Sequence, residues 1–344
     1  MNVDFIRDFK TDLSYLDGAS MLITGGTGSF GQHFIRYLLK HANLSRLVVF
    51  SRDEQKHFDM EQDFRDLDEK KILRYFIGDV RDIGRLEMAL RGVDYIVHAA
   101  AMKHVSLAEY NPFECVHTNI LGAENVVRAA IKSGVKHTIA LSTDKAANPI
   151  NLYGASKLAS DKIFTAANNL SAATGQFFSV VRYGNVIGSR GSVVPLFQKL
   201  IKAKSDHLPI TDMQMTRFWI TLQQSVDFVL SSLKMMQGGE VFVPKIPSMR
   251  VPDLAEAMAP GLEQRVIGIR PGEKLHEIMI GRDDAIHTIE MDDRYIIAPS
   301  CAFWIQGEAP QYEGKTVSDR FEYTSDANEE WLDADTMRDF LAQS

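Results

Sequence analysis

The sequence predicts an α/β fold built on a doubly wound parallel sheet. Short apolar runs alternate with segments of helical periodicity over the first half of the chain. Runs without polar alternation are typical of strands buried on both faces, as parallel strands are. A glycine-rich turn follows the first run directly, at residues 25–31, which is where such folds bind a dinucleotide.

Strands and helices are expected in strict alternation. The strands are predicted at the apolar runs 20–24, 46–50, 72–77, 94–99, 137–142 and 177–183. The helices are predicted at 29–41, 53–66, 82–91, 112–133 and 151–171. Strands joined through helices pair in parallel and are covered by those helices on both faces. The pattern is that of a Rossmann domain.

After Gly188 the alternation loosens, because prolines and glycines divide the chain into shorter elements. This predicts a smaller C-terminal substrate domain laid over the carboxyl ends of the strands. Residues 222–245 look like a helix and a strand that return to the main sheet. The cofactor domain is therefore expected at 19–187 and 220–245, and the substrate domain at 188–219 and 246–344. An acidic leader, residues 1–18, has no predicted place, and a short helix with an Asp cap should end the chain.

Composition and charge exclude several classes of function. The 344 residues carry a formal net charge of −7, and the Lys and Arg residues are dispersed, so no nucleic acid partner is expected. Cys115 and Cys301 have no second Cys or His at ligand spacing, so neither a disulfide framework nor a metal site is expected. No stretch is apolar over a bilayer-spanning length, and no signal peptide is evident. We expect a soluble, cytoplasmic protein without a membrane partner.

The glycine-rich turn is the predicted phosphate-binding part of a dinucleotide site. Gly25, Gly28 and Gly31 permit a tight turn, close approach of the backbone to a pyrophosphate, and close packing of the helix on the strand. The intervening side chains expected to line this turn are those of Thr27, Ser29 and Phe30. Further cofactor contacts are expected from Asp79, Val80, Ala99, Ala100, Ala101 and Val186.

The end of the second strand should contact the adenine ribose. Ser51, Arg52 and Lys56 offer a hydroxyl and two cations, which favour a ribose with a 2′-phosphate. Asp53 would favour a free 2′-hydroxyl, but its position before a helical segment is more typical of an N-cap. We therefore expect NADP rather than NAD.

The stretch LSTDKAANPINLYGASK, residues 141–157, carries the candidate catalytic residues. Thr143, Asp144 and Lys145 end the fifth strand, and Tyr153 and Lys157 lie four residues apart where a helix begins. That spacing places the phenol and the ammonium on one helix face, where the cation can stabilise the phenolate and make Tyr153 a base. A Tyr and a Lys at this spacing also occur on ordinary solvated helix faces.

Further motifs along the chain accompany the Tyr153–Lys157 pair and indicate a family. They are SRDE at 51–54, AAMKHVSLAEYNP at 100–112, STDKAANPINLYGASK at 142–157, RYGNVIGSRGSVVP at 182–195, MTRFWIT at 215–221, PKIPSM at 244–249 and IRPGEKLHE at 269–277. Together they resemble the extended short-chain dehydrogenase/reductases that act on nucleotide sugars. Within that group the chain is most similar to the C5-inverting UDP-N-acetylglucosamine 4,6-dehydratases of the pseudaminic acid pathway. The Asp144-Lys145 pair differs from the Asp-Glu pair of the related dTDP-glucose dehydratases.

The resemblance implies an NADP-dependent lyase reaction on UDP-N-acetylglucosamine. Tyr153, with Thr143 and Lys157, takes the 4-hydroxyl proton while hydride passes from C4 to NADP⁺. Lys145 then removes the C5 proton, because a desolvated ammonium beside another cation can lose its proton near neutral pH. Asp144, kept protonated by an apolar site, donates to the departing 6-hydroxyl, and hydride returns to C6. A homo-oligomer such as a hexamer is also implied.

The resemblance further implies residues that bind the UDP-sugar. Arg270 and Glu273 match positions that hold the nucleotide, and Lys103 and His104 should reach the sugar or its phosphates. The sugar pocket should be lined by Asn185, Ser189, Arg190, Gly191, Ser192 and Val193. Arg217 could serve either the ligand or a buried ion pair. His98, Phe218 and Trp219 are expected to pack in the core or against the pocket.

Three other functions compete with this interpretation. A C4 epimerase would use Tyr153 and Lys157 but has no need of an acid and a base at C5 and C6, so Asp144 and Lys145 argue against it. A C5-retaining 4,6-dehydratase differs in the face from which C5 is reprotonated, and its members usually carry membrane helices. A non-catalytic redox sensor that binds NADP is disfavoured by the intact set of four residues.

Overall fold

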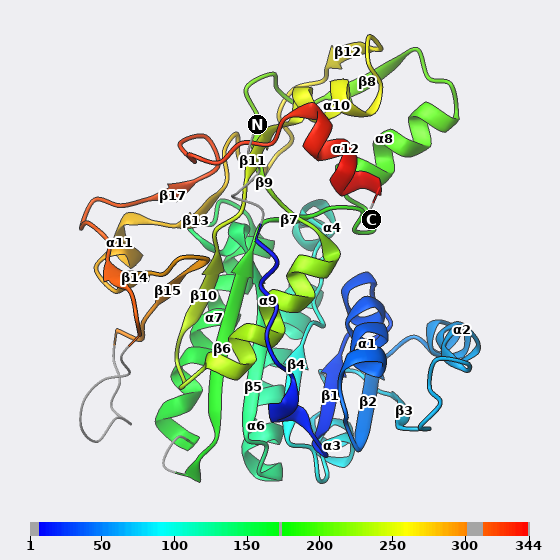
Figure 1. Cartoon of the computed structure of the whole chain (residues 1–344), viewed down its shortest axis with the longest axis vertical. Helices are drawn as coiled ribbons and strands as arrows, with labels where there is room; N and C mark the ends of the chain where they lie inside the picture. Colours follow the sequence, from blue (N-terminus) through cyan, green and yellow to red (C-terminus); the bar gives the residue numbers. More distant parts are fainter. Residues whose placement is uncertain (1–6, 172–173, 301–311, 343–344) are drawn as a thin grey trace.

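A mostly parallel sheet forms the centre of the molecule. The computed structural model describes residues 7–171, 174–300 and 312–342. Within them the largest sheet has ten strands in the order β16-β14-β15-β10-β6-β5-β4-β1-β2-β3 (Figure 1). The six predicted strands are β1 Ser20–Thr24, β2 Arg46–Ser51, β3 Leu73–Ile77, β4 Tyr95–His98, β5 His137–Thr143 and β6 Phe177–Tyr183. They pair in parallel, which confirms the doubly wound fold.

Helices cover the sheet at the places that the sequence predicts. They are α1 Ser29–His41, α2 Glu54–Phe64, α3 Ile83–Ala89, α6 Gly122–Ser133 and α7 Leu152–Ser171. Their contact with the sheet buries Leu22, Ile23, Val97, Ile139 and Val180 completely. Strands this apolar are stable only when both faces are covered, which is why the alternation with helices holds.

The helix predicted at 112–133 is helical throughout but irregular. It comprises α5 Pro112–Cys115, the π-helical turn η2 Val116–Leu121 and then α6, and it follows the short helix α4 Val105–Tyr110. Asn119 within the π-helical turn accepts a hydrogen bond from the Met102 N–H at 2.8 Å and donates one to the Met102 carbonyl at 3.0 Å. The widened turn thus holds the chain that leaves β4, and π-helical turns of this kind are frequent at functional sites.

The C-terminal part of the chain adds small sheets and short helices. Its strands outside the main sheet are β7 Asn185–Val186, β8 His207–Ile210, β9 Thr216–Ile220, β11 Ser248–Arg250, β12 Glu263–Val266, β13 Ile278–Ile280 and β17 Tyr323–Thr324. Its helices are α8 Val193–Lys202, α10 Val251–Met258, α11 Arg282–Ala285 and α12 Ala334–Ala342. A second core around Phe197, Trp219 and Leu254 lies between them. Asp333 caps α12, as expected, by accepting a hydrogen bond from the Thr336 N–H at 2.8 Å.

The main sheet extends beyond the boundary expected at residue 245. Helix α9 Leu222–Met235 leads into β10 Val241–Pro244, which pairs in parallel with β6. The sheet then continues antiparallel through β15 Arg294–Ile297, β14 Thr288–Glu290 and β16 Lys315–Thr316. Which part of the chain binds the cofactor and which binds the substrate stays a prediction. Three strands that were assigned to the substrate domain, β14, β15 and β16, belong to the central sheet.

The described part of the leader, residues 7–18, packs against α9. It contains the short helix η1 Ser14–Leu16. Phe9 contacts Phe228 with ring centroids 5.1 Å apart, and the Tyr15 hydroxyl donates to the Leu230 carbonyl at 2.9 Å. Arg7 forms an ion pair with Glu330 at 2.7 Å. This part of the leader is therefore an integral strap across the domain. The first six residues of the predicted leader, 1–6, lie outside the described residues, as does Cys301.

Candidate active site

The glycine-rich turn lies against the end of β4. Gly25 has a φ of +67°, and a Cβ there would lie 2.9 Å from the Ala100 nitrogen. A Cβ at Gly31 would lie 2.5 Å from the Gly26 carbonyl oxygen, so α1 can approach β1 only with glycine at this position. The Thr24 hydroxyl oxygen accepts hydrogen bonds from the Ala99 and Ala100 N–H groups. The cradle fits a pyrophosphate, because bare backbone and the N-terminus of α1 meet there.

The end of β2 holds the side chains predicted to meet the ribose. The Ser51 and Thr27 hydroxyls lie 2.8 Å apart. Asp53 accepts a hydrogen bond from the Lys56 N–H at 3.1 Å, which confirms it as the N-cap of α2, and its carboxylate pairs with the Lys56 ammonium at 3.0 Å. Arg52 is 63% exposed and lies 3.9 Å from the Asp79 carboxylate. Both cations can therefore turn toward an incoming phosphate.

The other predicted cofactor residues lie near the same edge of the sheet. Val80 is buried against α6, where a Cβ at Gly122 would lie 2.8 Å from it. Ala101 is exposed just beyond β4. Val186 pairs with Ile220 in the small sheet of β7, β9 and β11. Ser29 and Phe30 begin α1, directly after the turn.

Tyr153 and Lys157 are both buried at the start of α7. Burial raises the pKa of the Tyr153 phenol to about 12, partly offset by the positive charge of Lys145 and by a hydrogen bond with Thr143. Lys157 donates to the Leu141 carbonyl at 2.8 Å, and burial lowers its pKa. The cation that lowers the pKa of the phenol in this arrangement is Lys145, and the stabilisation of the phenolate by Lys157 stays a prediction.

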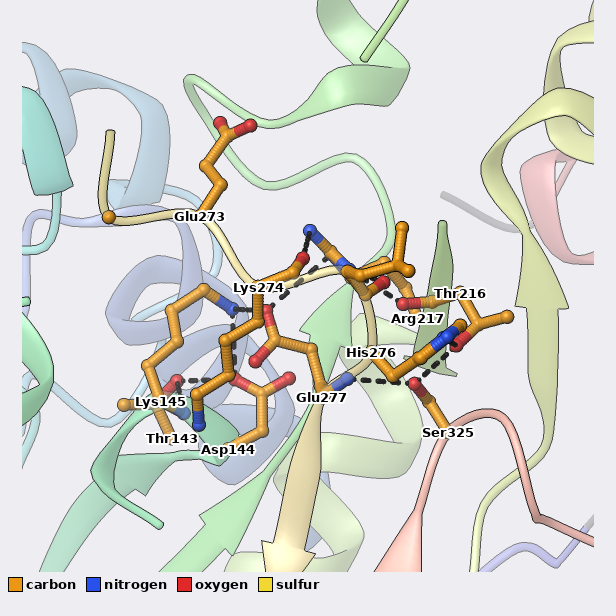
Figure 2. Close-up of polar contacts among 12 residues, drawn as sticks. Thr143, Asp144, Lys145, Thr216, Arg217, Glu273, Lys274, His276, Glu277 and Ser325 are labelled. Carbon is orange, nitrogen blue, oxygen red and sulfur yellow. Dashed lines mark hydrogen bonds and ion pairs between the residues drawn. The ribbon is translucent and has the colours of Figure 1, made fainter. Parts of the chain in front are cut away.

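Asp144 and Lys145 form the centre of a buried polar cluster, shown in Figure 2. They belong to η3 Asp144–Ala146, directly after β5. The Lys145 ammonium donates to Asp144 Oδ1 at 2.9 Å and pairs with Glu277 Oε1 at 3.1 Å. The Thr143 hydroxyl also donates to Asp144 Oδ1, at 2.8 Å. Sequence reasoning missed Glu277, although it ends the quoted motif at 269–277.

The charges of this cluster set the protonation of its members. Burial raises the pKa of Asp144, and the nearby Glu277 raises it further, so that the protonated acid expected there is favoured. For Lys145, burial alone would lower the pKa, but the Asp144 and Glu277 carboxylates outweigh burial and raise it. A neighbouring cation, Arg217, does lower the pKa of Lys145, but the expected net decrease is wrong for the resting site, because the two carboxylates have the larger effect.

Arg217 is a member of a buried ion pair. Its Nε lies 3.5 Å from Glu277 Oε1, and its Nη1 donates to the Thr216 and Leu275 carbonyls. Of the two roles left open by the sequence, the buried ion pair is formed in the structure, and contact of Arg217 with the ligand stays a prediction. Phe218 and Trp219 are fully buried, as expected. His98 is buried too, with Nδ1 2.8 Å from the Thr24 hydroxyl, and burial lowers its pKa to about 3, so it is a neutral core residue.

Two segments predicted to bind the sugar lie side by side. Lys103 donates to the Arg190 carbonyl at 2.7 Å, and a Cβ at Gly191 would overlap the His104 ring. The loop continues through Ser192, whose buried hydroxyl has no hydrogen-bond partner among the described residues. Nearby positions expected in the pocket are Asn185 in β7, Ser189 in the loop and Val193 at the start of α8.

The segment from Arg270 to Glu277 runs from the predicted nucleotide-binding residues to the polar cluster, and its part from Glu273 to Glu277 is shown in Figure 2. Arg270 is 58% exposed and lies 3.6 Å from the Glu273 carboxylate. Asn151, just before α7, donates to the Gly272 carbonyl at 2.7 Å, which fixes the segment beside the helix that carries Tyr153. The structure thus places the segment that carries Arg270 and Glu273 beside the start of α7 and beside the Asp144–Lys145 pair.

Comparison with known proteins gives the family. The model of the polysaccharide biosynthesis protein family matches residues 21–299. The chain belongs to this family. It is also an extended short-chain dehydrogenase/reductase, as the motifs indicate.

Relatives of the polysaccharide biosynthesis family include both dehydratases and epimerases. A Campylobacter jejuni protein named UDP-N-acetylglucosamine 4,6-dehydratase (inverting) is 53% identical over 330 residues, which are 94% of this chain and 98% of that protein. A Rickettsia bellii protein named UDP-glucose 4-epimerase is 42% identical over 285 residues, 81% of this chain and 82% of that protein. The crystal structure of Pen from Bacillus thuringiensis superposes with a TM-score of 0.87 at 36% identity and covers 96% of this chain and 98% of its own.

Within the described residues, no group of His, Cys, Asp and Glu side chains could hold a metal ion. No described helix has the length and apolar character needed to span a membrane.

Proposed function

We propose that this chain is a C5-inverting UDP-N-acetylglucosamine 4,6-dehydratase, a hydro-lyase. Its product would be UDP-2-acetamido-2,6-dideoxy-β-L-arabino-hex-4-ulose. The observation that carries the proposal is the pair formed by the buried Asp144 and the partly buried Lys145, with its 2.9 Å hydrogen bond, next to Tyr153. The 53% identical relative with this printed activity supports it over nearly the whole chain.

We propose NADP as the cofactor, held by the glycine turn and by Ser51, Arg52 and Lys56. A bound nicotinamide dinucleotide supplies a hydride acceptor for C4 and a hydride donor for C6. The chain itself contributes the backbone cradle at Gly25 to Gly31, and its exposed Arg52 could pair with a 2′-phosphate.

Oxidation at C4 requires a base for the 4-hydroxyl proton. Tyr153 lies within the site and shares a hydrogen bond with Thr143. Its pKa of about 12 is above neutrality, so the positive charge of Lys145 matters in forming the phenolate. Lys157, fixed by the Leu141 carbonyl, is the residue that would hold the nicotinamide ribose.

Elimination then needs an acid at the 6-hydroxyl and a base at C5. A proton shift from Lys145 to Asp144 gives a neutral acid beside a neutral amine, and it leaves the net charge of the buried cluster unchanged. Lys145 takes the C5 proton, the C5–H electron pair forms the C5=C6 bond, the C6–O bond breaks, and the hydroxide leaves with the Asp144 proton as water. Because inversion requires that C5 gain its proton on the face opposite to the one that lost it, Lys145 keeps the proton it removed, and C5 takes a proton from water on the other face.

The cycle leaves one proton too many on Tyr153 and a hydroxide from the water that protonated C5, while Lys145 and Asp144 are again the ion pair of the resting site. Thr143 hydrogen-bonds with both Asp144 and Tyr153, because its hydroxyl donates to Asp144 Oδ1 at 2.8 Å and it is a partner of Tyr153. Transfer of the Tyr153 proton to the hydroxide restores the starting state.

The test is incubation of the purified protein with UDP-N-acetylglucosamine in deuterated water without added nicotinamide. We expect a 4-keto-6-deoxy sugar with deuterium at C5, the L-arabino configuration, and no accumulation of reduced cofactor. Retention at C5 would contradict the inverting assignment. Formation of a C4 epimer alone would support the second candidate, a C4 epimerase, which the 42% identical Rickettsia bellii relative favours.

The biological setting is also part of the proposal. The product would enter pseudaminic acid biosynthesis at its first step, in the cytoplasm, and the enzyme would act as a homo-oligomer, for example a hexamer. The low cysteine content supports a reducing compartment. Size-exclusion chromatography with light scattering measures the oligomeric state directly.

A further inference from the structure

Glu277 is held more rigidly than a surface carboxylate could be. Its side chain is 2% exposed, between Lys145 at 3.1 Å and Arg217 at 3.5 Å. Its N–H donates to the Ser325 hydroxyl at 2.9 Å, and its carbonyl accepts from the Ser325 N–H at 2.9 Å. The Ser325 hydroxyl lies 2.6 Å from that of Thr216. The carboxylate is therefore fixed from β9 and from the strand pair β13–β17.

The Lys145 amine has three directions for hydrogen bonds beyond its stem. Asp144 Oδ1 and Glu277 Oε1 occupy two of them. These two carboxylate side chains are 1% and 2% exposed, whereas the Lys145 side chain is 26% exposed. Two of the three directions of the amine are thus taken by the two buried acids, and the side chain that carries the amine is partly exposed.

We propose that Glu277 is a positioning residue for Lys145: with Asp144 it fixes two directions of the Nζ atom and aims the third at the C5 proton of the sugar. This inference rests on the proposed function. In the reactive form the neutral amine donates its two N–H groups to the carboxylates, and its lone pair takes the third direction. When the lone pair accepts the C5 proton, the ammonium already has its partners in place.

The second oxygens of the two acids complete this arrangement. Asp144 Oδ2 and Glu277 Oε2 are buried and have no hydrogen-bond partner among the described residues. Asp144 can therefore carry its proton on Oδ2 while Oδ1 accepts from Lys145 and Thr143. Glu277 keeps its charge because Arg217 and Lys145 lower its pKa against the effect of burial. The proton for the leaving hydroxyl is thus carried by Asp144 and not by Glu277.

The groups that face Lys145 come from four parts of the fold. They are Asp144 beside it in η3, Tyr153 in α7, Arg217 in β9, and Lys274 and Glu277 in the segment before β13. Burial lowers the pKa of Lys145, Asp144 and Glu277 raise it, and Arg217 lowers it. If Glu277 had a purely structural role and only neutralised Arg217, removal of the Glu277 charge would leave the pKa of Lys145 unchanged.

The first test needs no substrate and so does not depend on the proposed function. Lys145 is labelled with an acylating reagent at fixed alkaline pH, and the rate is read by mass spectrometry of its peptide. Glu277→Gln keeps the shape and the acceptor but removes the charge, so the labelling rate should rise about tenfold or more, as one pKa unit implies. The control Glu290→Gln, whose partner Lys245 lies 2.7 Å away, should leave it unchanged. An unchanged rate in Glu277→Gln overturns the inference.

The second test separates two steps of turnover. Glu277→Ala should slow water loss and deuterium uptake at C5 about 100-fold, as for a misplaced catalytic group, while the rate of C4 oxidation stays near that of the unaltered enzyme. Glu277→Gln should retain most of the water loss, with its pH optimum shifted to lower pH. An equal fall of both steps in Glu277→Ala, or no fall in water loss, contradicts a positioning role. The thermal unfolding of Glu277→Gln checks that the fold is kept.

Discussion

Replacing Lys145 with methionine tests the separation of oxidation from elimination. The substitution keeps most of the side-chain volume and removes the amine that contacts both Asp144 and Glu277. Without a base at C5 the reaction should stop at the 4-keto sugar, and reduced cofactor should accumulate on the enzyme.

The size of the effect follows from the contacts. A positioned general base contributes about 10²–10⁴-fold to rate, so water loss should fall by at least about 100-fold. Oxidation should slow less, through the loss of a charge that favours the Tyr153 phenolate. Stability should fall by roughly 3 kcal/mol, the low end for breaking a buried ion pair, because Arg217 still pairs with Glu277 and Asp144 can bind a proton.

The assay is a single turnover with UDP-N-acetylglucosamine, in which absorbance at about 340 nm reports the reduced nicotinamide and mass spectrometry reports water loss. The matched control is Lys245→Met, which removes an ammonium paired with Glu290 outside the site. Normal water loss in Lys145→Met would refute the assignment of the base. If both the absorbance signal and the dehydration of the sugar disappeared, Lys145 would serve oxidation instead.

Three further outcomes are expected. Tyr153→Phe should abolish even the transient absorbance, and a normal oxidation rate in stopped-flow measurements would exclude Tyr153 as the base. Gly31→Ala should weaken dinucleotide binding in calorimetry, because its Cβ would lie 2.5 Å from the Gly26 carbonyl, whereas Gly84→Ala, with its nearest neighbour at 3.4 Å, should not. Folding depresses the pKa of His98 from 6.5 to about 3, so stability should be complete above pH 6.5 and fall by about 1.4 kcal/mol per pH unit below it. His98→Gln should flatten this slope in denaturant titrations.

The strands and the cofactor turn were predictable because their signals are local. An apolar run bounded by turn residues fixes a buried strand, and glycines at 25, 28 and 31 fix the turn. Each predicted strand from 20 to 183 was found within two residues of its expected ends. The helix at 112–133 was predicted as one piece, because periodicity does not distinguish a π-helical turn from its neighbours.

The charge balance of the site could not be predicted, since it depends on long-range contacts. Glu277 lies far from Lys145 in sequence, and the pairing of β13 with β17 helps to hold it there. Because the sequence does not reveal the contact with Glu277, we expected that burial and a neighbouring cation would lower the pKa of Lys145. The antiparallel strands β14 to β16 were missed for a similar reason, because they are short and their partners are distant in sequence.

The strap formed by residues 7–18 affects the order in which the chain folds. The Arg7 guanidinium donates two hydrogen bonds to the Glu330 carboxylate, which is 323 residues away in the sequence. Contacts of such long range close late, because the intervening chain must first be ordered. During synthesis the strap therefore cannot complete its contacts until the ribosome has made residue 330 and the intervening domain has folded.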